Sequence, residues 1–212
     1  MTTPFLTIAQ DTANEIIIKK SRFICSLFRV ESEEQAQAAI AKINKLHRKA
    51  THNCFAYLIG EHDQIQRESD NGEPSGTAGV PMLEALKANQ LHNVLAVVTR
   101  YFGGIKLGAG GLVRAYSGSV AGALKECGIA EKILMSRFSF LYDVNSVGRI
   151  LNILYQQDLF EIADVEYNLR AKIILKMQDS QKAEAEAWLT EHLNMPIELE
   201  LEGSEYAEVL VK

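Results

Sequence analysis

The sequence has little cysteine, no long apolar run and no leader-like start, and each absence excludes a class of protein. Its three cysteines, Cys25, Cys54 and Cys127, form no Cys-x-x-Cys pair. We therefore expect a reducing compartment rather than a disulfide framework. The longest apolar runs, such as Val94–Val98, fall far short of the about 20 residues that cross a membrane. The first ten residues lack a basic segment followed by an apolar stretch, so we expect no signal peptide and a cytoplasmic location.

The composition is that of an ordinary globular protein, with 47% apolar and 23% charged residues, which excludes disordered and collagen-like chains. The net charge of −5 argues, as an average, against a nucleic-acid-binding protein. The charge is uneven, however. Residues 1–132 carry 15 Lys and Arg against 13 Asp and Glu, a net charge of +2, whereas residues 133–212 carry 7 against 14, a net charge of −7. The net charge of the whole chain excludes a surface that is basic throughout, but it permits one local anion-binding site.

The first 132 residues combine the periodicities of strands and helices. Strands are expected at Glu15–Lys20, Arg22–Val30, Asn53–Ile59, Gln64–Arg67 and Val94–Thr99, and helices after Ser32, near Pro81 and over Ala109–Cys127. Ser32 with Gln35 three residues later forms a capping-box pattern. Four glycines in the last helix predict close packing of its backbone against the sheet: Gly110, Gly111, Gly118 and Gly122. The stretch Ser69–Gly79 has neither period, and a loop of that length is usually functional or mobile.

The second part, from residue 133, shows the order β-α-β-β-α-β, which predicts a ferredoxin-like α/β sandwich. Asp179 or Ser180 is expected to cap its second helix. Apolar residues alternate with glutamates from Ile197 to Glu202, and Val209 and Val211 are expected to finish the last strand. The predicted fold class is therefore α+β, with two domains comprising residues 1–132 and 133–212.

A strand, a glycine loop and a helix follow one another between Arg100 and Arg114. Such a junction presents backbone N–H groups and the positive end of a helix, and Lys106 and Arg114 add cationic side chains. The sequence thus allows two interpretations. Either the glycines permit a tight turn and a close helix–sheet contact, or they form a site for a phosphate backbone or another anion.

Two nucleotide-binding motifs fail at this junction. Gly103 and Gly108 have the spacing of a P-loop, but the Lys and Ser or Thr that should follow are absent. Gly108 and Gly110 begin a dinucleotide motif, but Val113 occupies the place of its third glycine. We therefore expect no nucleotide cofactor.

Enzyme interpretations rest on a few polar residues. His52 and Cys54 are two apart on a strand and share one face, so a Cys–His nucleophile pair is conceivable. Asp70 and Glu73 with His52 match no defined metal motif, and the segment around Ser75 is not a nucleophile elbow. We therefore predict no catalytic residue, no metal and no cofactor, and keep a hydrolase that uses His52, Glu73 or Cys54 as the alternative.

Three blocks, in order and spacing, resemble the IMPACT/YigZ family: residues 70–79 (DNGEPSGTAG), residues 79–83 with 97–108 (GVPML and VVTRYFGGIKLG), and residues 110–116 (GGLVRAY). The resemblance implies a first domain like domain IV of elongation factor G and the second domain of a small-subunit ribosomal protein. It implies a second domain like domain V of that factor. Eukaryotic members restrain a starvation-responsive kinase of translation initiation, and the resemblance does not carry that partner over to this chain. Some bacterial members carry a proline dipeptidase label.

The leading hypothesis is accordingly a non-enzymatic regulator, linked to translation or to a stress response, that binds RNA or the ribosome, with no membrane partner and no readable preference for DNA. The expected contact residues are Arg100, Tyr101, Gly103, Gly104, Lys106, Gly108 and Arg114. The expected motif loop comprises His52, Asp70, Gly72, Glu73, Ser75, Gly76, Thr77 and Gly79. A protein-interaction module, whose acidic second domain binds a basic partner, is the other alternative.

Overall fold

The computed structural model describes residues 4–211, and the chain forms two compact units. The first unit comprises Phe5–Lys132 and the end of the chain from Glu208, and the second comprises Ile133–Ala207 together with Pro4. Strand β7 (Ile129–Tyr142) starts in the first unit and ends in the second, whereas β10 (Glu200–Leu210) runs from the second into the first. The expected division between residues 132 and 133 did not assign the last residues, from Glu208, to the first unit.

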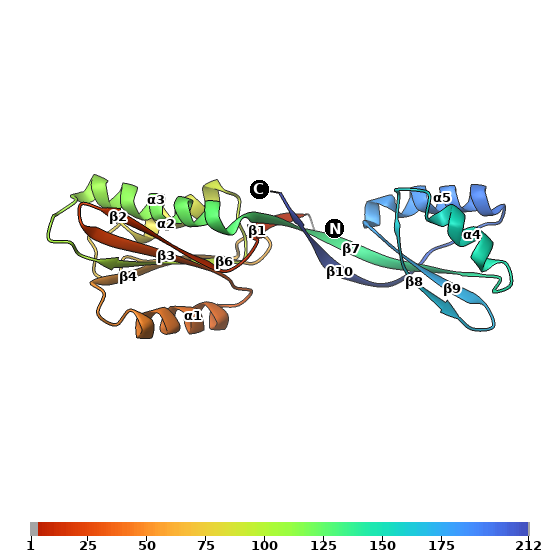
Figure 1. Ribbon diagram of the computed structural model, residues 1–212, viewed down its shortest axis with the longest axis horizontal. Coiled ribbons are helices and arrows are strands. Elements are labelled where there is room, and N and C mark those ends of the chain that lie inside the picture. Colours follow the sequence, from red (N-terminus) through yellow and green to blue (C-terminus); the bar gives the residue numbers. More distant parts are fainter. Residues whose placement is uncertain (1–3, 212) are drawn as a thin grey trace. The chain divides into compact units, whose positions relative to one another are not determined.

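The first unit is built on an antiparallel sheet with the strand order β2-β3-β6-β4-β5. Helices α2 and α3 cover one face of the sheet and α1 covers the other (Figure 1). The strands are β2 (Thr12–Ile18), β3 (Ser21–Arg29), β4 (His52–Ile59), β5 (Ile65–Ser69) and β6 (Val94–Tyr101), and the helices are α1 (Glu33–Leu46), α2 (Gly79–Ala88) and α3 (Ala109–Cys127).

The central strand β6 shows why its sequence is apolar throughout. Val94, Ala96 and Val98 pack in the core beneath α2 and α3, whereas Leu95 and Val97 pack in the core beneath α1. Successive side chains of a strand point to opposite faces, so a strand covered on both sides needs apolar residues at every position. The strand expected at Val94–Thr99 is therefore confirmed, and it is buried on both faces.

The start of α1 follows the predicted cap. Ser32 Oγ accepts a hydrogen bond from the backbone N–H of Gln35 at 3.3 Å. The Gln35 side chain in turn accepts from the backbone N–H of Glu31 at 2.8 Å, one residue before the position that a standard capping box uses. Both bonds satisfy backbone donors that have no partner inside the helix.

The glycines of α3 pack less closely than predicted. A Cβ atom at Gly118 would meet no heavy atom within 4 Å, and one at Gly110 would lie 3.7 Å from the guanidinium of Arg114. Gly122 is closer to the sheet, since its Cβ would lie 3.4 Å from Asn14 Oδ1 on β2. The prediction of close backbone packing against the sheet is therefore wrong for Gly110 and Gly118, because Gly118 faces open space and Gly110 contacts only the Arg114 side chain of its own helix.

The second unit has the predicted order β-α-β-β-α-β, and its strands are arranged β10-β7-β9-β8. Figure 1 shows α4 and α5 on the same side of this sheet. The remaining elements are α4 (Val147–Leu154), β8 (Glu161–Tyr167), β9 (Ala171–Met177), the 3₁₀ turn η1 (Asp179–Gln181) and α5 (Lys182–Leu193). The core beneath the helices includes Phe140, Leu154, Ile173 and Leu189. No helix within residues 4–211 is long and apolar enough to cross a membrane.

The structure corrects three local predictions. Strand β1 (Phe5–Ile8) was missed, because four residues carry too short a pattern and the strand exists through its pairing with Ile129–Lys132 of β7. The last strand, which was expected to include Val211, is β10 and ends at Leu210. Neither Asp179 nor Ser180 caps α5. The capping box lies one turn earlier, where Gln178 and Gln181 exchange side-chain bonds across η1.

Candidate functional site

The predicted site residues meet at the end of the first sheet where β6 ends and β4 begins. Arg100 near the end of β6 lies opposite Phe23 on β3 and His52 on β4. Two loops close this end of the sheet: residues 70–78 between β5 and α2, and residues 102–108 between β6 and α3. The structure therefore brings together the two sequence blocks that were identified as motifs.

A buried ion pair joins these two blocks. Arg100 Nη1 donates to Glu73 Oε1 at 2.5 Å, and the Tyr116 hydroxyl of α3 donates to the same oxygen at 2.8 Å. Arg100 is 5% exposed, Glu73 is 9% exposed and Tyr116 is fully buried. Burial, together with the neighbouring Cys54 and Glu73 side chains, raises the pKa of Tyr116, so its hydroxyl stays protonated and can donate. Arg100 neutralises a carboxylate in the interior, which makes the pair an internal tie between the two loops.

The guanidinium of Arg100 has few other contacts. Its Cζ lies 5.3 Å from the ring centroid of Phe23 and 5.5 Å from that of Phe102. Its Nη2 lies 3.5 Å from Ser21 Oγ, and its Nε is buried without a hydrogen-bond partner among the residues that the structure describes. The prediction that Arg100 contacts an external anion therefore conflicts with its placement, because the side chain is enclosed and already paired.

Asp70 organises the loop before α2. Its carboxylate accepts hydrogen bonds from the backbone N–H groups of Gly76, Ala78 and Gly79, at 2.8, 2.9 and 2.9 Å. Gly79 is the first residue of α2 and Ala78 is its N-cap, whose side chain cannot accept a hydrogen bond, so Asp70 supplies the acceptor that the helix start needs. Partial burial opposes ionisation of Asp70, but the three donors outweigh it and hold the pKa of Asp70 below its ordinary value.

Cys54 and His52, the conceivable nucleophile pair, hydrogen-bond to other groups rather than to each other. Cys54 Sγ lies 2.9 Å from the backbone oxygen of Asp70 and 3.4 Å from the Tyr116 hydroxyl, and burial raises the pKa of Cys54 to about 12. His52 Nδ1 lies 2.8 Å from the backbone oxygen of Asn71, and since a carbonyl only accepts, Nδ1 carries the proton. His52 Nε2 then faces Glu73 Oε2 at 3.8 Å. A protonated, buried thiol bonded elsewhere is no nucleophile.

The other motif-loop residues shape the loop. Gly72 and Gly76 have φ angles of +85° and +75°, which favour glycine. Thr77 Oγ1 donates to the backbone oxygen of Pro74 at 2.6 Å, and Ser75 is exposed. Among the residues that the structure describes, no group of three or more His, Cys, Asp or Glu lies close enough together to hold a metal ion. The loop is thus held by internal bonds around Asp70.

Gly103 in the glycine loop leaves no room for a side chain. A Cβ at Gly103 would lie 2.1 Å from the backbone carbon and oxygen of Lys20, in the turn between β2 and β3. The Gly103 N–H donates to Ser21 Oγ at 3.1 Å. Gly104 and Gly108 instead have positive φ angles and open space around them. The expected close contact is therefore found at Gly103, but it is made with the β2–β3 hairpin turn and not between the helix and the sheet.

The remaining predicted contact residues lie at the surface. Lys106 and Arg114 are exposed, and Tyr101 is half-buried, with its hydroxyl 2.9 Å from His47 Nδ1. A hollow of about 370 Å³ opens between the two loops and the first turn of α3. It is lined by Glu73, Pro74, Arg100, Phe102, Lys106, Leu107, Gly108, Ala109 and Leu112. Sequence reasoning missed Tyr116 and Lys20, whose roles depend on contacts across 43 and 83 residues of chain.

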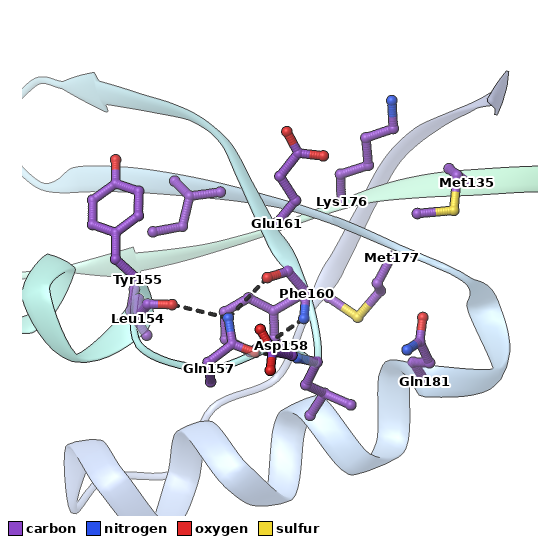
Figure 2. A pocket seen from close by; sticks show the side chains of 12 residues that line it. Met135, Leu154, Tyr155, Gln157, Asp158, Phe160, Glu161, Lys176, Met177 and Gln181 are labelled. Carbon is purple, nitrogen blue, oxygen red and sulfur yellow. Dashed lines mark hydrogen bonds between the residues drawn. The ribbon is translucent and has the colours of Figure 1, made fainter. Parts of the chain in front are cut away.

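A larger hollow, of about 580 Å³, lies in the second unit beside the loop from α4 to β8 (Figure 2). Its Gln157 side chain holds that loop, donating to the backbone oxygens of Leu154 and Phe160 at 2.9 and 2.8 Å. Asp158, Glu161 and Lys176 lie on its wall. None of the motif residues lies there, so the candidate site remains in the first unit.

The fold and site define a two-unit α+β protein whose first unit carries the diagnostic loops. The model of the Impact N-terminal domain matches residues 19–124, which span both loops. YvyE of Bacillus subtilis, an IMPACT family member, is 47% identical over 190 residues, covering 90% of this chain and 87% of that protein. YigZ of Escherichia coli is 40% identical over 143 residues, covering 66% and 70%.

A crystal structure titled as a hypothetical protein superposes with a TM-score of 0.61 at 32% identity, covering 95% of this chain and 97% of that one. The chain belongs to the IMPACT family, and the predicted family resemblance is confirmed.

Proposed function

We propose that this protein is a non-enzymatic regulator of translation that binds RNA or the ribosome through the loop end of its first unit. The observation that carries the proposal is that one cation of the motif is buried and paired whereas two others are exposed. Arg100 is buried in an ion pair with Glu73, whereas Lys106 and Arg114 are exposed on the glycine loop and on the first turns of α3. The surface therefore keeps its positive charge where the family motif lies.

The candidate catalytic groups support a non-enzymatic role. Glu73 is ion-paired, Cys54 is protonated and buried, and the Asp70 carboxylate is bonded to three backbone N–H groups. None of these groups is left to accept a proton from a substrate or to attack one. The family resemblance implies a first unit like domain IV of elongation factor G and a second unit like domain V, and this expectation favours ribosomal RNA as the target.

A salt-titrated co-sedimentation with ribosomes, alongside fluorescence anisotropy with RNA oligonucleotides, tests the proposal. The variant Lys106→Ala with Arg114→Ala should weaken binding and lower the slope of log K against log salt by about 0.7 for each lost phosphate contact. The matched control is Lys87→Ala with Lys125→Ala, which removes two cations from the last turns of α2 and α3. Absence of binding at low salt, or equal loss in both variants, would overturn the proposal.

The second unit offers a second candidate function, binding of a basic protein partner. Lys172 and Lys176 on its sheet pair with Glu202 and Glu205, both at 2.9 Å, so acidic residues such as Glu161 and Glu166 are left in excess. Affinity purification with the full chain, compared with Glu161→Gln combined with Glu166→Gln, separates this function from RNA binding. Loss of a specific protein partner in the variant, with ribosome binding intact, is the expected result.

A further inference from the structure

Three loops that are distant in sequence meet at the loop end of the first unit, as Figure 1 shows for the β2–β3 turn, the segment after α1 and the segment before α3. The contacts are direct. Gly103 lies against the backbone of Lys20, and the Phe102 N–H donates to Thr51 Oγ1 at 3.1 Å. The structure thus adds cations from two other loops to the glycine loop.

The β2–β3 turn carries lysine at both central positions. Lys19 and Lys20 have φ angles of +46° and +64°, and both side chains are exposed. A two-residue turn with two positive φ angles favours Asn-Gly or Asp-Gly, and lysine gains nothing there from conformation. A residue held in a disfavoured backbone region is a reason to look for a role of its side chain. The backbone conformation of the turn does not explain why both positions are lysine, so their positive charge is the property to consider.

Only some of the cations at this end have a carboxylate partner. Arg22 is paired with Glu15 at 2.8 Å, and Arg100 is paired with Glu73. Within residues 4–211, no carboxylate lies within 4 Å of the charged groups of Lys19, Lys20 or Lys106. Arg48 and Lys49, exposed after α1, are also unpaired by this criterion. These cations are therefore available to a polyanion.

An exposed aromatic ring lies among these cations. Phe102 is 47% exposed, its backbone is fixed by Thr51, and its ring contacts the enclosed guanidinium of Arg100. Phe102 also lines the 370 Å³ hollow together with Lys106. That volume is near the lower limit for ligand pockets, which suits one flat group rather than an extended ligand. Aromatic side chains in such surroundings stack on unpaired bases.

We propose that the RNA bound here is single-stranded, with one unpaired base stacked on Phe102 and its flanking phosphates paired with Lys106 and with the Lys19–Lys20 turn. This inference rests on the proposed function and names its ligand class. In a duplex the bases are stacked on each other and a protruding phenylalanine reaches none of their faces. The ring would then be an exposed apolar group without a partner.

The test compares a single-stranded RNA oligonucleotide with a duplex of the same length by fluorescence anisotropy. The single strand should bind the full chain more tightly than the duplex. Phe102→Leu, which keeps an apolar side chain, should weaken single-strand binding about ten-fold, whereas Phe102→Tyr should preserve it. Lys19→Asn with Lys20→Gly removes two charges and gives the turn its favoured residues, so it should fold and lower the salt slope by about 1.4.

The outcomes separate the two proposals. Equal affinity for duplex and single strand, or unchanged binding in Phe102→Leu, overturns this inference. If ribosome binding still depends on Lys106 and Arg114 in that case, the proposed function stands. If neither oligonucleotide nor ribosomes bind at low salt, both proposals fail. A thermal melt of each variant shows that loss of binding is not loss of fold.

Discussion

Arg100 and Glu73 form a buried ion pair that ties the end of β6 to the loop before α2, with Nη1 and Oε1 2.5 Å apart. The Tyr116 hydroxyl completes the arrangement from α3 at 2.8 Å from the same oxygen. Desolvation of two charges offsets much of their attraction, so the net contribution of such a pair to the free energy of unfolding is small. Here it fixes the two motif loops against each other and against α3.

Removing one partner of this pair should be strongly destabilising. Glu73→Gln leaves the Arg100 charge buried and uncompensated, and we expect the free energy of unfolding to fall by about 3–5 kcal/mol. Urea denaturation followed by circular dichroism measures it. The double variant Glu73→Leu with Arg100→Met removes both charges and should recover much of the loss. A decrease below about 1 kcal/mol in Glu73→Gln would contradict the assignment of a buried pair.

Asp70 should make stability depend on pH in the acid range. Its pKa is lowered in the folded protein, so its contribution is present above its unfolded pKa of about 3.9 and is lost as the pH falls through the lower folded value. Asp70→Asn should lose about 1–2 kcal/mol at neutral pH, as for other helix caps, and should flatten the acid decline in stability. Unfolding curves from neutral pH down to below the folded pKa measure both effects. An identical acid decline in wild type and variant would contradict this role.

The cysteines should be unreactive in the native protein. All three are buried and free, and burial raises the pKa of Cys54 to about 12. Thiol titration should show slow modification under native conditions and three fast thiols after unfolding. Because the folded pKa is the higher one, stability is complete below the unfolded pKa of about 8.5 and falls as the pH rises from there toward 12. Rapid native modification of Cys54 would revive the nucleophile hypothesis.

Two glycines should respond in opposite directions to alanine. Gly103→Ala places a Cβ 2.1 Å from the Lys20 backbone. Because the clash is with backbone atoms, no side-chain rotation removes it, and we expect the free energy of unfolding to fall by about 1–3 kcal/mol. Gly118→Ala meets no atom within 4 Å inside α3 and should raise the free energy of unfolding by about 1 kcal/mol through helix propensity. Melting temperatures compare the two directly. Destabilisation by Gly118→Ala would show that this helix face is covered.

The contact between Gly103 and the Lys20 backbone should also affect RNA binding. If Gly103→Ala displaces the Lys19–Lys20 turn, RNA affinity should fall even in the fraction that remains folded, whereas Gly118→Ala should leave affinity unchanged. Measuring anisotropy at a temperature where both variants are folded tests this expectation.

The sequence by itself determined the elements whose signals are local. Alternating and continuous apolar residues placed β6, Ser32 marked the start of α1, and the glycine-rich blocks identified the family. Strand and helix periods are properties of neighbouring residues, so they can be recognised without knowledge of the fold. The β-α-β-β-α-β order of the second unit followed from the same local patterns.

Only the tertiary structure decided which charges face water. Arg100 and Lys106 are six residues apart in one motif, yet the first is enclosed by Glu73 and Tyr116 and the second is exposed. The turn at Lys19 and Lys20 joins the site because Gly103 lies against its backbone. Burial and pairing depend on residues from distant segments, so a charge pattern along the chain specifies a cationic loop but not which of its cations a ligand can reach.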